Sequence, residues 1–274
     1  MINIYYCVDK KLFGQQILSL LSLVKYCKEP INVINLTVEI PEFNKKGKKF
    51  TEKEDKLCES ILKRGNKQST YKSVDVSNLF KEKLLMGPNT HNKYYSYYVT
   101  VRLLAHLVPE IPDKVIYLDA DTIMNGNIKE LFDIDMNGFE IAGRRDSGRI
   151  TNYFQSGVML MNMKEIRASG LLERACNLCA TKKYICYIDM SALNTACKKR
   201  KMLPKKYNCY KYDKNCIVHH VCATRESKIP FTKKWWHRIK TDELDLMRKF
   251  HPEYEEFYSE YEKIKKDNKQ IFGE

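Results

Sequence analysis

The start of the chain alternates between strand-like and helix-like patterns, and this alternation restricts the fold more than any other feature. Residues 2–8 form an apolar, β-rich run, residues 12–26 carry apolar side chains at helical spacing, and residues 31–39 return to strand character. A strand, a helix and a second strand make the unit that builds a parallel sheet. We therefore predict an α/β fold with a mixed, mostly parallel sheet flanked by helices.

Strand and helix patterns continue along the rest of the chain. Thr51 and Glu54 match a capping box at the start of a helix. No linker rich in Pro, Gly or Ser divides the chain, so we predict one domain over residues 1–240 and a helical C-terminal extension over residues 241–274. Further helices are predicted at residues 51–64, 94–108, 163–181 and 189–200, and further strands at residues 70–76, 115–119, 139–143, 156–162 and 216–221.

The bulk properties restrict the class of protein. The 274 residues carry a formal charge of +14, which favours an anionic partner such as nucleotide phosphate, nucleic acid or an anionic membrane surface. No run approaches the roughly 18 consecutive apolar residues of a membrane span, and no secretory leader is visible at the start of the sequence. We expect a soluble, cytoplasmic protein.

The ten cysteines are scattered, several of them in apolar runs where a thiol packs as a small hydrophobe. This distribution favours a reducing cytoplasm. Cys176 and Cys179 have the spacing of a zinc-binding pair, but no second pair completes a four-ligand set. A structural zinc site is therefore the weaker interpretation of these two residues.

An apolar run at residues 115–124 includes two carboxylates, Asp119 and Asp121, separated by Ala120. Side chains alternate along a strand, so the two carboxylates project to one side and Ala120 to the other. Ligands of open α/β sheets bind beyond the carboxyl ends of the strands. Oxygen ligands of this kind suit Mg²⁺ or Mn²⁺, which bind nucleotide phosphates. A solvated turn is the alternative, because the Asn-Gly pair that follows favours turns.

Other polar residues accompany this strand. Asp9 follows the first strand and lies at the same sheet edge as Asp119 if the two strands are parallel neighbours; a solvated loop position is the alternative. His219 and His220 end the last predicted strand on opposite sides, so at most one joins a metal held by the carboxylates. Arg102 has the charge to pair with a carboxylate or a phosphate, although an exposed helical arginine is the commoner case.

Both tryptophans lie among cations in residues 233–240. Aromatic rings among basic residues suit the anionic inner face of the plasma membrane, so peripheral membrane contact through this segment is one interpretation. The other is that the tryptophans close the core beneath the C-terminal helix, because tryptophan is usually largely buried.

The chain resembles the family 8 glycosyltransferases, whose motifs recur in the family's order over about residues 1–230. The resemblance implies a GT-A fold, which is Rossmann-like, and a retaining, metal-dependent enzyme similar to the bacterial galactosyl- and glucosyltransferases of lipopolysaccharide or capsule synthesis. It implies hexose transfer from a UDP-sugar to a glycan, glycolipid or glycoprotein hydroxyl. The matching stretches are residues 2–9, Arg102-Leu103, 117–122 (similar to the DxD motif), 153–162 (Tyr-Phe-Gln-Ser-Gly-Val-Met-Leu-Met-Asn), 189–194 with Leu203-Pro204 and Tyr207-Asn208, and 217–219.

The resemblance also implies roles for individual residues. The ligands of Mn²⁺, or of Mg²⁺, would be Asp119, Asp121 and His219, with His220 as the alternative to His219. The catalytic and sugar-facing residues would be Asp189, Gln155, Met190 and Arg102, with Asp146 as a further candidate. The nucleotide and its diphosphate would contact Cys7, Val8, Asp9, Lys11, Asp119, Ala120, Asp121, Arg102 and either Lys228 or Arg225.

Some positions depart from the family pattern. Gln155 replaces a sugar-facing asparagine, Met190 replaces a glutamine, and Lys10 or Lys11 replaces a ribose-contacting asparagine. These departures leave the identity of the sugar open. A thioether is a poor covalent carrier, so Met190 favours same-face attack by the acceptor, assisted by the departing phosphate, over double displacement.

Two other functions fit parts of the sequence. A nucleotidyltransferase also uses paired carboxylates and a metal, but no glycine-rich phosphate loop follows the first strand, where Gly14 stands alone. A non-catalytic module for nucleic acid would explain the charge of +14 and would bind oligonucleotides in a salt-sensitive way. Because the resemblance covers most of the chain, we expect no nucleic-acid partner.

Overall fold

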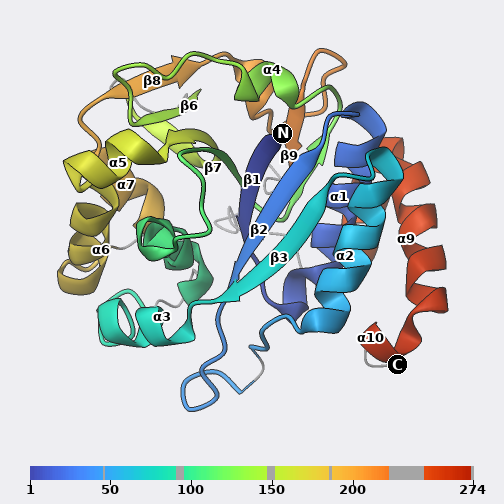
Figure 1. Ribbon diagram of the computed structural model, residues 1–274, viewed down its shortest axis with the longest axis horizontal. Helices are drawn as coiled ribbons and strands as arrows, with labels where there is room; N and C mark the ends of the chain where they lie inside the picture. The colour runs from blue at the N-terminus through green and yellow to red at the C-terminus, as the bar shows by residue number, and fades with distance from the viewer. Residues whose placement is uncertain (46, 91–95, 147–151, 185–186, 222–243, 273–274) are drawn as a thin grey trace, which may run out of the picture.

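A seven-stranded sheet forms the centre of the molecule (Figure 1). The computed structural model describes residues 1–45, 47–90, 96–146, 152–184, 187–221 and 244–272. In spatial order the strands are β3 (Thr70–Asp75), β2 (Ile31–Thr37), β1 (Ile2–Cys7), β4 (Lys114–Leu118), β7 (Phe154–Asn162), β6 (Ile141–Arg145) and β8 (Arg200–Leu203).

The sheet is mostly parallel, as the sequence predicts. Strands β3, β2, β1 and β4 are parallel neighbours. Strand β7 runs antiparallel to both β4 and β6, and β8 pairs in parallel with β6. The carboxyl ends of β1 and β4 therefore lie at the same edge of the sheet, where Asp9 and Asp119 follow them.

Helices cover both faces of the sheet (Figure 1). Strand β1 alternates between two hydrophobic clusters, because Ile4 and Tyr6 face one side and Tyr5 the other. The cluster containing Ile4 is closed by α1 (Phe13–Tyr26), α2 (Glu52–Gly65) and α9 (Glu255–Asp267). The cluster containing Tyr5 is closed by the 3₁₀ helix η2 (Tyr97–Leu107), α3 (Ser77–Lys83), α5 (Met163–Ser169), α6 (Leu171–Thr181) and α7 (Ile188–Ala196).

A second, two-stranded sheet extends the edge where β4 ends. It pairs β5 (Thr122–Met124) with β9 (Val218–His220) in antiparallel register, with Thr122 opposite His220 and Ile123 opposite His219. The short helix α4 (Lys129–Phe132) follows β5 in the chain.

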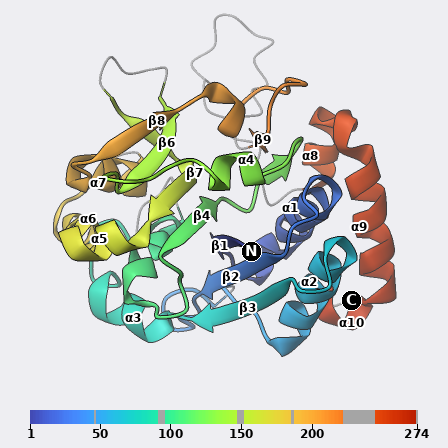
Figure 2. The ribbon, with the colours of Figure 1, turned by 45° about the horizontal axis from the view of Figure 1, so that its top comes forward.

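The C-terminal segment is helical, as predicted, and packs against the domain (Figure 2). It consists of α8 (Leu244–Phe250), the 3₁₀ turn η5 (Pro252–Tyr254), α9 and α10 (Lys269–Phe272). A side chain at Gly14 in α1 would overlap Leu244 and lie 3.2 Å from the Tyr261 hydroxyl, so glycine permits this close approach. The predicted boundary between residues 240 and 241 lies outside the described residues, and the division into domain and extension stays a prediction.

Several elements differ from the sequence prediction. The helix predicted at residues 163–181 is broken by Gly170, which adopts φ 67°, a conformation that favours glycine. The helix predicted at residues 189–200 ends at Ala196, and Arg200 already begins β8. The helix predicted at residues 94–108 is a 3₁₀ helix over its described part. Unpredicted elements are α3, α4, β5, β8, η1 (Lys10–Leu12) and η3 (Lys205–Tyr207).

No helix within the described ranges combines the length and the apolar composition that crossing a membrane requires.

Candidate functional site

Asp119 and Asp121 lie in the turn between β4 and β5, where backbone bonds hold them from both sides. The Asp119 amide donates to the Gly157 carbonyl at 2.9 Å, and the Asp121 carbonyl accepts from Val221 at 2.8 Å. The strand ends at Leu118, so the two carboxylates converge through the turn and not through strand alternation. Ala120 between them is buried.

His220, and not His219, approaches this pair. His220 Nε2 lies 3.2 Å from Asp121 Oδ1 and 3.5 Å from Asp119 Oδ2. Ligand atoms of these three residues lie within 4.8 Å of one another. Because His220 stands opposite Thr122 in the small sheet, its ring faces the turn that holds the aspartates. The predicted ligand His219 points to the other side of β9 and is corrected to His220.

The environment of His220 suits a metal ligand. Its Nδ1 lies 3.2 Å from the amide oxygen of Asn208, and this contact orients the ring so that Nε2 faces the two carboxylates. Burial raises the pKa of Asp121, but the neighbouring His220 outweighs it and holds that pKa below its usual value. The pKa of Asp119 shifts in the opposite direction. Burial raises it, and this effect outweighs the lowering by Arg102 and His220.

Gly157 in β7 makes room for the cluster. A Cβ at this position would overlap His220 Cε1 and lie 2.6 Å from His220 Nδ1 and 2.8 Å from Asp119 Oδ2. The residues present therefore fit a divalent cation: two carboxylates and an imidazole nitrogen converge where the neighbouring strand has no side chain.

Arg102 joins the cluster from η2. Its Nη2 donates to Asp119 Oδ1 at 2.7 Å, and its Nη1 donates to the Ser156 carbonyl at 2.7 Å and lies 3.3 Å from Asp189 Oδ2. The guanidinium also packs 4.3 Å from the centre of the Tyr117 ring, and the Tyr117 hydroxyl donates to Asp119. Burial opposes its charge, yet Asp119 and Asp189 raise the pKa of Arg102. Arg102 thus forms ion pairs with Asp119 and Asp189.

Asp189 is the second residue of α7, whose N-cap Tyr187 is the one described non-glycine residue with positive φ (52°). The Ser156 hydroxyl donates to Asp189 Oδ2 at 2.7 Å. Helix α7 is fastened to β7 by Asn194, whose side chain exchanges hydrogen bonds of 2.8 and 2.9 Å with the backbone of Phe154. The position of Asp189 is therefore set by the sheet.

Gln155 and Met190 are both buried near this part of β7 and α7. Gln155 Nε2 lies 3.5 Å from Asp146 Oδ1, so these two predicted residues do meet. Gln155 Oε1 is buried and has no hydrogen-bond partner among the described residues. Such an acceptor is costly to bury unless a ligand group satisfies it.

The first strand brings Cys7, Val8 and Asp9 to the same edge. Continuing the pairing of Tyr5 with Tyr117 brings Cys7 level with Asp119. Both backbone polar groups of Val8 bond to the Asn35 side chain, at 2.9 and 3.2 Å. Asp9 is buried, which raises its pKa, and it accepts from the Lys11 amide at 3.1 Å.

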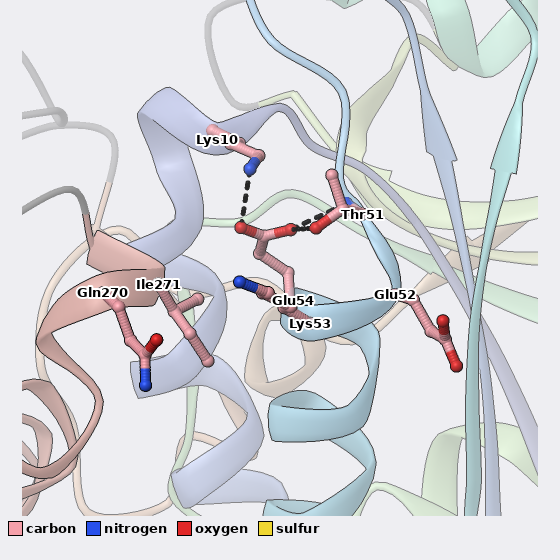
Figure 3. A pocket seen from close by; sticks show the side chains of 7 residues that line it. All are labelled: Lys10, Thr51, Glu52, Lys53, Glu54, Gln270 and Ile271. Atoms are coloured by element: carbon pink, nitrogen blue, oxygen red, sulfur yellow. Dashed lines mark hydrogen bonds and ion pairs between the residues drawn. The ribbon is translucent and has the colours of Figure 1, made fainter.

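Lys10 turns away from this edge. Its Nζ lies 2.7 Å from Glu54, the residue that completes the predicted capping box with Thr51 (Figure 3). Of the two lysines considered for the ribose position, Lys10 is therefore already paired. The pocket in Figure 3 has a volume of about 470 Å³, and neither Asp119, Asp121 nor His220 lines it. Its lining residues are Lys10, Thr51, Glu52, Lys53, Glu54, Gln270 and Ile271.

Some predicted residues lie outside the described ranges, namely Arg225, Lys228 and the segment 233–240. Cys176 and Cys179 are buried and free in α6, and neither belongs to a metal-ligating group in the described part of the chain. Two of the scattered cysteines, Cys209 and Cys216, form a disulfide that was not predicted from the sequence.

Sequence reasoning missed Asn208, Gly157, Ser156 and Tyr117. All four fall within or beside stretches quoted for the family resemblance, but the sequence assigned them no role. A glycine inside the apolar pattern of residues 154–162 was the clearest signal, since such a glycine often marks a close approach by another group.

Comparison with known proteins identifies relatives. The model of the family described as Glycosyl transferase family 8 matches residues 3–240. Glycosyltransferase GlyF of Streptococcus pneumoniae serotype 4 is 32% identical over 131 residues, 46% of this chain and 31% of that protein. The lipopolysaccharide 1,3-galactosyltransferase of Salmonella typhimurium is 27% identical over 147 residues, 46% of this chain and 43% of that protein. The chain spans less than half the length of these curated relatives.

Among solved structures, the galactosyltransferase LgtC, in complex with donor and acceptor sugar analogues, matches with a TM-score of 0.64 and 16% identity. The match covers 92% of this chain and 96% of that chain. This likeness confirms the GT-A fold predicted from the sequence.

Proposed function

The chain belongs to glycosyl transferase family 8, and on that premise we propose that it transfers galactose or glucose from a UDP-sugar to a hydroxyl group of a glycan, with retention at the anomeric carbon. The single observation that carries the proposal is the convergence of Asp119, Asp121 and His220 beside Asp189 at the carboxyl edge of the sheet. Relatives named as lipopolysaccharide galactosyl- and glucosyltransferases support the choice of hexose and of a glycan or glycolipid acceptor.

Asp119, Asp121 and His220 would hold Mn²⁺, or Mg²⁺ in its place. A bound divalent ion would supply Lewis-acid neutralisation of the charge on the UDP leaving group. Hydrogen bonds from Arg102 and Tyr117 to Asp119 support this role, because they orient that carboxylate before any ligand arrives.

Asp189 and Gln155 would bind the sugar. Asp189 Oδ2 already accepts from Ser156, which leaves Oδ1 as an acceptor for a sugar hydroxyl. The buried Gln155 Oε1 would accept from another hydroxyl, and that bond would relieve its lack of a partner. Met190, also buried, offers no oxygen nucleophile, which supports same-face attack assisted by the departing phosphate.

The remaining assignments rest on the sequence. Arg225 or Lys228 would add positive charge at the diphosphate, and residues 233–240 would contact a membrane at the cytoplasmic face. The chain's acceptor would then be a lipid-linked or membrane-proximal saccharide. The alternatives of a nucleotidyltransferase and a nucleic-acid-binding module gain no support from the family match.

Release of UDP tests the proposal. The full chain is incubated with UDP-galactose, UDP-glucose and other nucleotide sugars, with EDTA or with added Mn²⁺. We expect UDP release from one of the two UDP-hexoses, abolished by EDTA and restored by Mn²⁺. Absence of turnover with every UDP-sugar, or turnover unaffected by EDTA, would overturn the proposal. Asp121→Asn should lose this turnover, and Asp133→Asn is its matched control, because Asp133 forms an exposed ion pair with Lys129.

A further inference from the structure

A second group of metal-ligating side chains lies on the opposite side of β9 from the aspartates. His219 and His220 are consecutive in this strand, so their rings project in opposite directions. His220 faces Asp119 and Asp121, whereas His219 faces the C-terminal turn η5 and the residue before it.

His219, His251 and Glu253 form this second group. The two imidazoles and the carboxylate each offer a ligand atom within 4.8 Å of the others. The rings of His219 and His251 pack edge to face with centroids 5.1 Å apart. His251 Nδ1 lies 3.0 Å from Glu253 Oε1, and Glu253 lies at the surface, so solvent ions have access to the group.

The hydrogen bonds of His219 indicate an incomplete polar environment. The residue is fully buried, and its Nε2 has no hydrogen-bond partner within the described residues. Its Nδ1 lies 2.7 Å from the Tyr254 hydroxyl, which in turn accepts from Asn125 Nδ2 at 2.9 Å. A hydroxyl bound to one ring nitrogen orients the ring and leaves the other nitrogen for a metal.

We propose that His219, His251 and Glu253 form a zinc site that fastens the C-terminal helical segment to β9. Two imidazoles and one carboxylate are a ligand set that Zn²⁺ takes in proteins, with a water in the fourth position. The set differs from that of the first cluster, where two carboxylates suit Mn²⁺ or Mg²⁺ better. Zinc here would tie η5 to the strand that carries His220.

Zinc binding by the full chain tests this proposal without any readout of activity. The background is the Asp121→Asn variant, in which the first cluster is weakened, with the disulfide kept oxidised. Zn²⁺ affinity is measured by competition with a chromophoric chelator. We expect one equivalent of zinc in this background, and at least a tenfold loss of affinity, on the order expected for disrupted metal sites, when His251→Ala or Glu253→Gln is added.

His106→Ala in the same background is the matched control, because His106 pairs with Glu173 at 3.0 Å and belongs to no metal-ligating group of the described residues. This variant should keep the zinc. Glu253→Gln changes a surface residue, so its zinc affinity tests the proposal even if His251→Ala fails to fold. Three results would overturn the proposal. The first is equal affinity in all four proteins, and the second is no stoichiometric zinc in the background. The third is a thiolate charge-transfer band in the absorption spectrum when Co²⁺ takes the place of zinc.

Discussion

Arg102 is buried and forms an ion pair with the partly buried Asp119, with Arg102 Nη2 2.7 Å from Asp119 Oδ1. The same guanidinium lies 3.3 Å from Asp189, so one cation links a carboxylate of the metal cluster to a carboxylate proposed to face the sugar. The sequence led us to expect Arg102 at the leaving group. In the structure its guanidinium contacts both carboxylates, and we infer that it positions them.

Replacing Arg102 should therefore damage both stability and function. Arg102→Ala leaves the buried Asp189 and the partly buried Asp119 without their cation, and removal of one partner of a buried pair typically costs up to about 3–5 kcal/mol of unfolding free energy. Arg102→Lys keeps the charge but not the fork of donors, so we expect intermediate stability and little recovery of UDP-sugar turnover. Urea unfolding and UDP release measure the two effects.

Arg167→Lys is the control for Arg102, because Arg167 pairs with a largely exposed Asp113. It should change the unfolding free energy by less than about 1 kcal/mol. Full turnover by Arg102→Ala would contradict the positioning role.

Gly157→Ala should abolish metal binding at the first cluster. The added methyl would overlap the His220 ring and lie 2.8 Å from Asp119 Oδ2, so the ligands cannot keep their arrangement. Gly126→Ala is the comparison, because the atoms nearest to its methyl would belong to Ile217, at 3.3 Å, and to none of the proposed ligands. Titration of Mn²⁺ by electron paramagnetic resonance should show binding to Gly126→Ala and not to Gly157→Ala. Equal Mn²⁺ binding by both variants would contradict the assignment.

Met190→Leu should retain most of the activity. The two side chains have similar volumes, and such exchanges in a core usually cost less than about 1.5 kcal/mol. If Met190 performs no chemistry, the kcat for UDP-sugar turnover should fall by no more than roughly tenfold, which corresponds to that same free energy. A loss of several orders of magnitude, with the melting temperature unchanged, would show that the thioether has a chemical role.

Protonation of Glu140 in acid should make the protein less stable. Burial raises its pKa, but hydrogen bonds from Ser169 and from the amides of Lys199 and Lys198 hold that pKa below its usual value. A carboxyl group with a depressed pKa stabilises the fold above its unfolded pKa of about 4.3, and this contribution is lost as the pH falls through the folded pKa.

Glu140→Gln should accordingly lower the unfolding free energy at pH 7 by about 1.5–3 kcal/mol, the value typical of hydrogen bonds to charged groups. The difference from the unmodified protein should shrink below about pH 4. Glu130→Gln is the control, because that residue is an exposed partner of Lys206. A difference that stays constant with pH would contradict this account.

The fold was largely predictable because local patterns determine most of it. Alternation of strand and helix over residues 2–39 predicts the parallel half of the sheet, and the apolar run before Asp119 predicts its central strand. The early end of α7 was not predictable, because tertiary pairing of β8 with β6 competes there with helical propensity. The break at Gly170 instead depends on a positive φ, which the helical spacing of apolar residues does not report.

The site was predictable to the level of residue type. Asp119 and Asp121 follow from their spacing, but the choice between His219 and His220 depends on the register of β9 against β5, which no local pattern specifies. Asn208 and Ser156 act through contacts with residues distant in sequence, so they became visible only in the folded structure.

The affinity for UDP, measured by isothermal titration calorimetry with and without Mn²⁺, tests the central claim most directly. We predict that the unmodified chain binds UDP tightly only with Mn²⁺, that Asp121→Asn loses this dependence, and that Asp133→Asn keeps it. UDP binding that is equally strong without metal, or unchanged in Asp121→Asn, would contradict a metal-dependent nucleotide-sugar site at Asp119, Asp121 and His220.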